Sequence, residues 1–349
     1  THSGVINATT LNATSKSEIS ANVTVNNVNA NTTSKGNINL ISTKDIELTS
    51  IQTANGDINI SSFGDVVLKD IKTLGTTESN DLNVTTYVGD IIVGDIDLGT
   101  LGDVSLNSIN AIDFTKENAN IVSDELILST KNSIAIENQT TVNSLSIITR
   151  DAGNVSFTQN TSKALDLKDI SVAKGTLDIL NDSSITVSSV KIIANEDASD
   201  INITSSNGDI VLGYLSAGRY ALDADEFNAF GLGDDTTITS FGDITLSANS
   251  GSISSLETDS INVIADDLTI TALSGISTIA SVNNLKNITT TSGDITIEDK
   301  NGFGEVKKVL SIENIASTKT NQDTIQITST NTIKVEENSS LSADIIKLI

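Results

Sequence analysis

The sequence predicts an all-β chain that folds as a parallel β-helix solenoid with coils of about 20 residues. A Gly-Asp pair followed by alternating apolar residues returns many times along the chain. Ile, Val and Thr are plentiful, which is typical of strands. Proline is absent, so the many turns must depend on Gly, Asn, Asp and Ser. Together these features indicate short strands joined by tight turns.

The clearest copy of the repeat is residues 53–68, in which each of two Gly-Asp pairs opens a short strand. Ile58 and Ile60 follow the first pair, and Val66 and Leu68 follow the second. Residues two apart on a strand face the same side, so each run can bury one face. Gly accepts unusual turn conformations, and Asp can bond the nearby backbone to close the corner.

The spacing of these strands defines the coil. The first apolar positions are Ile38, Ile46, Ile58 and Val66, so the steps are 8, 12 and 8 residues and the unit returns after 20. A propeller blade needs about 40 residues, and a leucine-rich repeat needs an L-x-x-L-x-L frame that is missing here. A parallel β-helix remains, with coils stacked at about 4.8 Å and about 17 coils over the whole chain.

The order of segments follows from this pattern. Residues 1–33 alternate without Gly-Asp corners and are expected to form an irregular first coil or cap, and residues 34–349 the β-helix rod. Further copies of the corner begin at Gly89, Gly94, Gly102, Gly208, Gly242 and Gly293. The tail from Leu341 to Ile349 reads as a strand without a cap, so we expect the chain to continue or this edge to stack on a partner.

Residues 213–235 interrupt the repeat and are expected to be a non-repeat insertion. Long loops on repeat scaffolds often carry function, so this one is a possible binding loop. The alternative is a local insertion that packs its own aromatic rings on the rod. The residues expected to bind are Tyr214, Arg219, Tyr220, Phe227 and Phe230.

Charge and composition exclude several functions. The chain has 45 acidic and 20 basic residues, a formal net charge of −25 and only two arginines, so neither nucleic acid nor an anionic membrane is an expected partner. No apolar run reaches the length of a membrane span. Cysteine is absent and the one histidine is His2, so we expect no enzyme. A polysaccharide-active β-helix enzyme is a minor alternative.

Calcium is the one cofactor that the sequence allows, because clustered carboxylates suit a hard cation. The candidate ligands all lie in the insertion: Asp223, Asp225, Glu226, Asp234 and Asp235. The alternative, which we favour, is that a Gly-Asp corner is simply a good turn.

Asn-x-Ser/Thr tripeptides are frequent and are glycosylation candidates if the chain meets a glycosylating enzyme. With Asn, Ser and Thr so common, chance accounts for most of them. The candidate acceptors are Asn7, Asn12, Asn22, Asn31, Asn59, Asn83, Asn138, Asn154, Asn160, Asn181, Asn202, Asn287 and Asn338.

The Gly-Asp-Ile-x-Ile corners and the 20-residue coil resemble the repeat region of filamentous-haemagglutinin-like bacterial exoproteins. The resemblance covers most of residues 34–349 and implies a single-stranded, right-handed parallel β-helix, export to the cell exterior and a role in adhesion. The secretion domain of that family carries an Asn-Pro-Asn-Leu motif, which a chain without proline does not contain.

Two functions from different classes follow. The first is a secreted or cell-surface adhesin that binds a glycan or protein of a host or neighbouring cell through loops and surface, without catalysis. The second is a subunit that pairs with other copies of itself, or with neighbouring surface proteins, to build an extracellular filament or surface layer. The insertion favours the first, and the uncapped tail favours the second.

Overall fold

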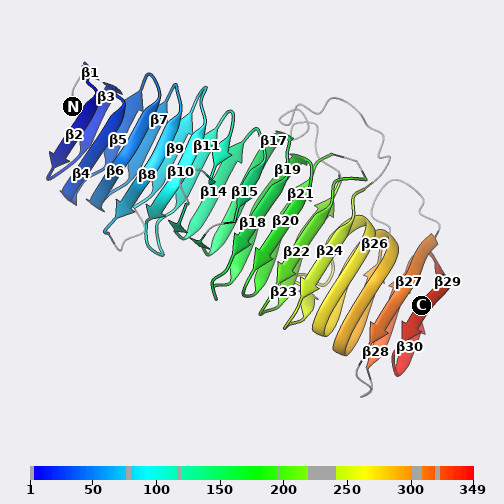
Figure 1. Cartoon of the computed structure of the whole chain (residues 1–349). Helices are drawn as coiled ribbons and strands as arrows, with labels where there is room; N and C mark the ends of the chain where they lie inside the picture. The colour runs from blue at the N-terminus through cyan, green and yellow to red at the C-terminus, as the bar shows by residue number, and fades with distance from the viewer. Residues whose placement is uncertain are drawn as a thin grey trace. The chain divides into compact units, whose positions relative to one another are not determined.

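The computed structural model describes residues 4–75, 80–115, 119–137, 139–194, 197–218, 241–300, 309–318 and 323–349. In these ranges the chain is all-β, without helices, and parallel strands stack as a β-solenoid of about 13 turns with a spacing of about 22 residues (Figure 1). The predicted fold is confirmed. The expected 17 coils were too many because many coils are longer than the 20 residues of the clearest repeats.

Contacts within the chain define two compact units, Thr1–Asn160 and Thr161–Ile349. The strands of the first unit are β1 (Val5–Asn7), β2 (Thr10–Ser15), β3 (Ile19–Thr24), β4 (Asn27–Lys35), β5 (Ile38–Ser42), β6 (Ile46–Asn55), β7 (Ile58–Ser62), β8 (Val66–Thr73), β9 (Leu82–Thr86), β10 (Ile91–Asp97), β11 (Val104–Ser108), β12 (Ile112–Asp113), β13 (Ile121–Val122), β14 (Glu125–Thr130), β15 (Ile134–Ile136), β16 (Thr140–Thr141), β17 (Ser144–Ala152) and β18 (Val155–Gln159).

Two parallel ladders order the first unit. The one that we call ladder A runs β1–β3–β5–β7–β9–β11–β14–β17. Ladder B runs β2–β4–β6–β8–β10–β13–β16. Ile38 pairs with Ile58 and Ile46 with Val66, so the predicted 20-residue register is the observed one.

The core of the first unit consists of alternate residues of each strand. In β8, Val66 and Leu68 are fully buried, and after a shift in the alternation so is Ile71. The chain therefore turns a corner inside one strand. Gly94 lies at this corner of β10, where an added Cβ would collide with the carbonyl oxygen of Leu68. The sequence predicted that Gly94 opens a separate strand, and this was wrong because the ladder continues through the bend.

The second unit is built in the same way. Its strands are β19 (Leu165–Lys174), β20 (Leu177–Asn181), β21 (Ile185–Ile192), β22 (Ile201–Ser205), β23 (Ile210–Ala217), β24 (Ile244–Ala248), β25 (Ile253–Ser255), β26 (Val263–Asp299), β27 (Val309–Ser317), β28 (Thr324–Ser329), β29 (Thr332–Ser342) and β30 (Ile345–Leu348). One ladder begins β19–β21–β23, and a second runs β20–β22–β24–β26–β28–β30.

The expected insertion at 213–235 begins inside a regular strand. Tyr214 belongs to β23, opposite Ser189 of β21. The next strand of the neighbouring ladder pairs Ile201 with Ile244, which are 43 residues apart rather than about 20. The extra residues include 219–240, which lie outside the described ranges.

Candidate functional site

Aspartates at the Gly-Asp corners of the first unit, and at equivalent corners without glycine, form stacked rows of carboxylates. Asp45 Oδ1 accepts a hydrogen bond from the backbone N–H of Asp65 at 2.9 Å. Asp65 Oδ1 accepts in turn from the backbone N–H of Asp90, again at 2.9 Å. Each carboxylate therefore bonds the equivalent position of the next coil, and these bonds tie neighbouring coils together at the turn.

A second corner row follows the same rule. Asp57 Oδ1 accepts from the Asp81 N–H at 3.2 Å, and Asp81 Oδ1 accepts from the Asp103 N–H at 3.0 Å. Asp103 then accepts from the Glu125 N–H at 3.1 Å. Burial raises the pKa of the Asp103 carboxyl, and the nearby charges of Asp81, Asp124 and Glu125 raise it further. The repeated Asp therefore has a structural role, but its carboxylate bonds the backbone of the next coil rather than the nearby backbone that the sequence interpretation named.

The second unit has one place where three carboxylates converge. Oxygen atoms of Asp243, Asp266 and Asp267 all lie within 4.8 Å of one another, and the three residues are half-buried. Asp243 belongs to a corner row, because its backbone N–H donates to Asp200 Oδ1 at 2.9 Å and its own Oδ1 accepts from the Asp267 N–H at 3.2 Å. Burial raises the pKa of Asp243 to about 6, with the Asp267 charge as the next cause.

Neighbouring side chains already stabilise much of this acidic cluster. Lys286 Nζ lies 3.3 Å from Asp267 Oδ2 and 2.8 Å from a Glu313 carboxylate oxygen. The side-chain amide of Asn284 donates to Asp267 Oδ1 at 2.5 Å, and that of Asn283 donates to Asp266. The oxygen-only donor set suits a hard cation such as calcium. The Lys286 ammonium and the two asparagine amides, however, already stabilise these carboxylates without a bound cation.

The calcium candidates of the sequence cannot be compared with this cluster. Asp223, Asp225, Glu226, Asp234 and Asp235 all lie in 219–240, outside the described residues. Four members of the expected binding loop lie there too: Arg219, Tyr220, Phe227 and Phe230. Tyr214, the remaining member, is a half-buried residue of β23.

The glycosylation candidates occupy different environments. Asn181 is fully buried, and its side-chain amide donates to the carbonyl oxygens of Lys163, Ser183 and Ser184. This asparagine is a core residue and offers no accessible acceptor nitrogen. Asn83 and Asn202 use their amides to bond Asn59 and Asp178 of neighbouring coils.

The other acceptors differ in exposure. The exposed acceptors are Asn7, Asn12, Asn154, Asn160, Asn287 and Asn338, and the half-buried ones are Asn22, Asn31 and Asn59. Asn138 lies outside the described residues.

A different row of side chains stands at equivalent positions of five successive ladder A strands, four of them directly after the strand and Arg150 near the end of β17. Ser62 pairs with Thr86, and Thr130 pairs with Thr149, so the residues that follow them stack from coil to coil. We call this set the aromatic–basic row: Phe63, Tyr87, Ile109, Lys131 and Arg150.

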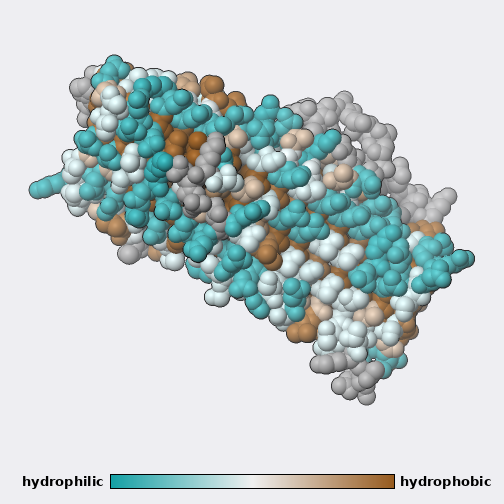
Figure 2. Space-filling view, viewed as in Figure 1, coloured by the Kyte–Doolittle hydropathy of each residue, from teal (hydrophilic) through white to brown (hydrophobic). Residues whose placement is uncertain are grey.

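The apolar half of the aromatic–basic row faces solvent. Phe63 is 55% exposed, Tyr87 is 50% exposed and Ile109 is 59% exposed. The rings of Phe63 and Tyr87 pack with centroids 5.1 Å apart and planes tilted by 33°. Figure 2 shows apolar patches in brown on the surface of the first unit. Exposed apolar side chains that adjoin one another in this way are typical of interaction sites.

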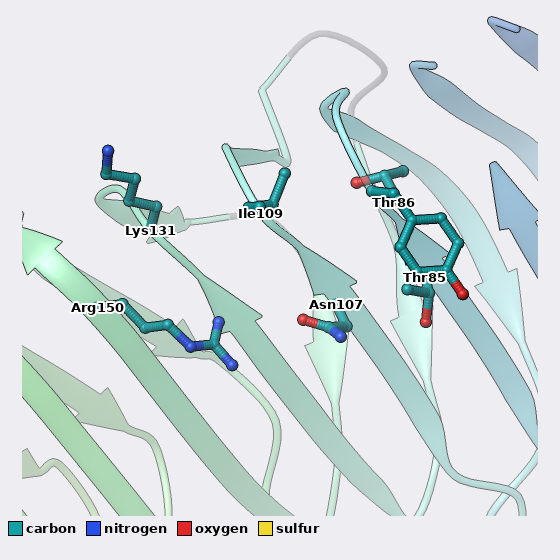
Figure 3. Close-up of a pocket in the computed structure, with 7 residues that line it drawn as sticks. Thr85, Thr86, Asn107, Ile109, Lys131 and Arg150 are labelled. Carbon is teal, nitrogen blue, oxygen red and sulfur yellow. The ribbon is translucent and has the colours of Figure 1, made fainter. Parts of the chain in front are cut away.

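The row borders a groove of about 410 Å³ in the first unit (Figure 3). Its lining residues are Thr85, Thr86, Tyr87, Asn107, Ile109, Lys131 and Arg150. In Figure 3, Asn107 lies between Thr85 and Arg150, and the Arg150 guanidinium points toward it. This volume is within the range of small-ligand sites.

Three polar side chains of the groove are available for a ligand. Among the described residues, the side chains of Thr85, Asn107 and Arg150 make no hydrogen bond or ion pair. Lys131 is engaged, because its Nζ lies 3.6 Å from Asp151 Oδ2. Sequence reasoning missed this site. The pattern is visible once the coils are aligned by strand pairing. The equivalent position is then a large apolar or aromatic residue in three successive coils and a basic residue in the next two.

No protein-family model matches this sequence, and no curated protein or solved structure matches it either.

Proposed function

We propose that this chain is an adhesin-type surface protein that acts outside the cell, binds through its surface and performs no catalysis. The aromatic–basic row is the observation that carries the proposal. A β-solenoid scaffold and a strongly acidic, cysteine-free composition are compatible with this role. The resemblance of the Gly-Asp corners to filamentous-haemagglutinin-like exoproteins supports the same class.

The row has the composition of a binding surface. Tyr and Arg are the residues that contribute most often to binding energy, because they combine area with directed hydrogen bonds. Beyond the ring contact between Phe63 and Tyr87, the fold gains little from exposing three large apolar side chains in adjacent coils. A partner that covers them would recover the free energy of their burial, about 25 cal/mol for each Å² of apolar surface removed from water.

The carboxylate rows favour a non-catalytic chain over a polysaccharide-active enzyme. A glycosidase needs two carboxylates that face a cleft and the substrate. In the first unit the corner carboxylates of Asp45, Asp65 and Asp81 accept backbone hydrogen bonds from the next coil. These acids therefore have a structural role that accounts for their repetition.

The experiment is an adhesion assay with the whole chain. Wells coated with the wild-type protein are offered bacterial and animal cells, and retained cells are counted after washing. We expect retention well above that of wells coated with an unrelated acidic protein of similar size, and a clear loss with Phe63→Ala/Tyr87→Ala. Retention at the background level with every cell type would overturn the proposal.

Self-association is the second candidate function, and the exposed side chains of the last strand favour it. Ile345 is 46% exposed and Leu348 is 40% exposed, and β30 pairs with β28 on one side. Its other edge has no partner strand among the described residues, so a further strand, from the same polypeptide or from a second copy, could pair there. Sedimentation velocity over a hundredfold concentration range separates the candidates, because assembly predicts species that grow with concentration and simple adhesion predicts one species.

A further inference from the structure

We propose that the groove beside the aromatic–basic row binds a carboxylated saccharide, with the sugar carboxylate on Arg150. The inference rests on the proposed function in taking this row as the binding surface, and it deepens that proposal by naming the ligand class. It follows from three features of the groove: an apolar platform, unpartnered polar groups beside it, and a cation at one end.

The platform is formed by Tyr87 and Ile109. The two residues stand at equivalent positions of neighbouring coils, and Phe63 packs against the Tyr87 ring at 5.1 Å, which holds that ring in place. An aromatic face together with an aliphatic side chain provides a flat apolar surface about one strand spacing long, roughly 5 Å. The C–H face of a pyranose ring is flat and weakly apolar, so it can stack there.

Polar groups run parallel to the platform. Thr85 and Asn107 are directly paired in ladder A, so their side chains leave the same face of the sheet one coil apart. Neither side chain bonds another described residue, so a hydroxyl and an amide are free to donate and accept. A saccharide offers hydroxyls along its ring edge that match this spacing. A purely apolar ligand would bury both groups without hydrogen-bond partners, which is unfavourable.

Arg150 sets the charge of the ligand. It is one of two arginines in a chain with a formal net charge of −25, and it has no ion-pair partner among the described residues. In Figure 3 its guanidinium points along the groove toward Asn107. A guanidinium offers two parallel N–H donors that match a carboxylate. Lys131 fits this role less well, because its ammonium lacks the two parallel donors of a guanidinium and already lies 3.6 Å from Asp151 Oδ2.

Other ligand classes fit less well. An acidic peptide would place its carboxylate on Arg150 equally well. However, an extended peptide pairs best with a free backbone edge, and Thr85 and Asn107 offer only side chains on the outward face of their strands. An anionic membrane would meet the field of the acidic chain over a much wider area than the groove. Both classes are outcomes of the test below.

Calorimetric titration of the whole chain at low ionic strength tests the proposal. The probes are tri-galacturonate, a hyaluronan hexasaccharide and sialyllactose, with the methyl ester of tri-galacturonate as the neutral match. We expect at least one acidic probe to bind with 1:1 stoichiometry. The ester should bind at least tenfold more weakly than tri-galacturonate wherever the latter binds. Binding should weaken as salt is added, because screening reduces the attraction between the carboxylate and Arg150.

Variants locate the site. Arg150→Ala should lower affinity at least tenfold, and Arg150→Lys about fivefold, because an ammonium cannot make the bidentate contact. Tyr87→Ala should also lower affinity about tenfold by removing the platform. Lys35→Ala is the matched control, since it removes one exposed cation from the same unit at β4 and should leave affinity unchanged.

Three results would overturn the ligand class: no acidic probe binds, binding is unaffected by Arg150→Ala, or an Asp/Glu-rich peptide or phosphatidylserine vesicle binds through Arg150 while the saccharides do not. The adhesion assay separates this inference from the proposed function. If wild type and Arg150→Ala retain cells equally, the chain is an adhesin but its ligand does not bind in this groove, and the present inference is wrong. If the saccharide binds but no cells are retained, the groove is a saccharide site and the proposed adhesive function is wrong.

Discussion

Two sets of turn residues follow the same coils of the first unit, and they differ in what their side chains contact. The corner carboxylates of Asp45 and Asp65 are satisfied from within, because each accepts a backbone N–H of the next coil. In the aromatic–basic row, Tyr87 is half exposed and Ile109 is more than half exposed. Arg150 has no ion-pair partner among the described residues. The first set holds coils together, whereas the second faces outward.

The difference teaches how to separate structure from function on a repeat scaffold. The coils present outward positions, and aspartates at several of those positions in the first unit join one coil to the next. A residue is informative about binding when the neighbouring coil does not use it. The abundance of Asp is therefore a poor guide to a site in this chain, and one unpaired arginine is a better one.

The largest effect that we predict is on the corners. Gly56 has φ of 152°, and an added Cβ would lie 2.5 Å from the carbonyl oxygen of Gly36 in the preceding coil. Gly56→Ala should therefore lower the free energy of unfolding by about 3 kcal/mol, from backbone strain and a clash that the stacked coil cannot relieve. Urea denaturation followed by circular dichroism measures it.

Gly99→Ala is the matched control for this prediction. Gly99 also has a positive φ, 72°, but an added Cβ would meet no atom within 4 Å. The substitution should cost only the conformational term, about 1 kcal/mol. Equal losses for the two variants would mean that close stacking of the corners contributes nothing.

The second prediction removes one carboxylate from a corner row. Asp65→Ala leaves the Asp90 N–H without its acceptor, which should cost about 1–2 kcal/mol of unfolding free energy. Asp65→Asn keeps an oxygen at the same place and should change stability by less than about 0.5 kcal/mol. If Asn proves as costly as Ala in urea denaturation, the charge rather than the hydrogen bond holds the row.

Much of this architecture could be predicted from the sequence. The spacing of Ile38, Ile46, Ile58 and Val66 predicted the register that pairs residues 20 apart, because alternation and turn chemistry are local properties. Gly94 was misplaced for the same local reason. A Gly-Asp pair is typical of a turn between two strands, and only pairing with the neighbouring strand shows that the ladder continues through the bend at Gly94.

The candidate site was out of reach of this local reasoning. Phe63, Tyr87 and Arg150 are separated by more than 20 residues, and the coils between them differ in length, so their stacking follows from pairing and not from a fixed period. The sequence placed its aromatic and basic candidates at 213–235 because they are contiguous there. Burial of Asn181 was likewise invisible, since the tripeptide carries no sign of which face it occupies.

The third prediction concerns the acidic cluster of the second unit, where the carboxylates of Asp266 and Asp267 lie close to the corner carboxylate of Asp243. The pKa of Asp243 is raised to about 6 from 3.8, so the folded state binds a proton more tightly than the unfolded state. The stability from this proton is fully present below about pH 4 and is lost as pH rises through 6. Because the carboxyl is only half-buried, the loss should be at most about 1 kcal/mol.

Asp243→Asn isolates that contribution. The amide oxygen can still accept from the Asp267 N–H, while the repulsion with Asp266 and Asp267 is reduced. Denaturation at pH 4 and pH 7 should show wild type losing stability relative to the variant as pH rises. Parallel pH profiles of the two proteins would contradict the assignment.

The smallest predicted effect is the one that sharpens the comparison most. If the aromatic–basic row serves a partner, removing Arg150 should change the unfolding free energy by less than about 0.5 kcal/mol, as for an exposed residue without partners. Tyr87→Ala should cost somewhat more, about 0.5–1.5 kcal/mol, because it also removes the ring contact with Phe63. Thermal and urea denaturation of both variants measure these changes beside Asp65→Ala. A loss of unfolding free energy for Arg150→Ala as large as that for Asp65→Ala would show that Arg150 stabilises the fold. The contrast between the corner carboxylates and the aromatic–basic row would then be wrong at Arg150, the residue on which the binding proposal depends.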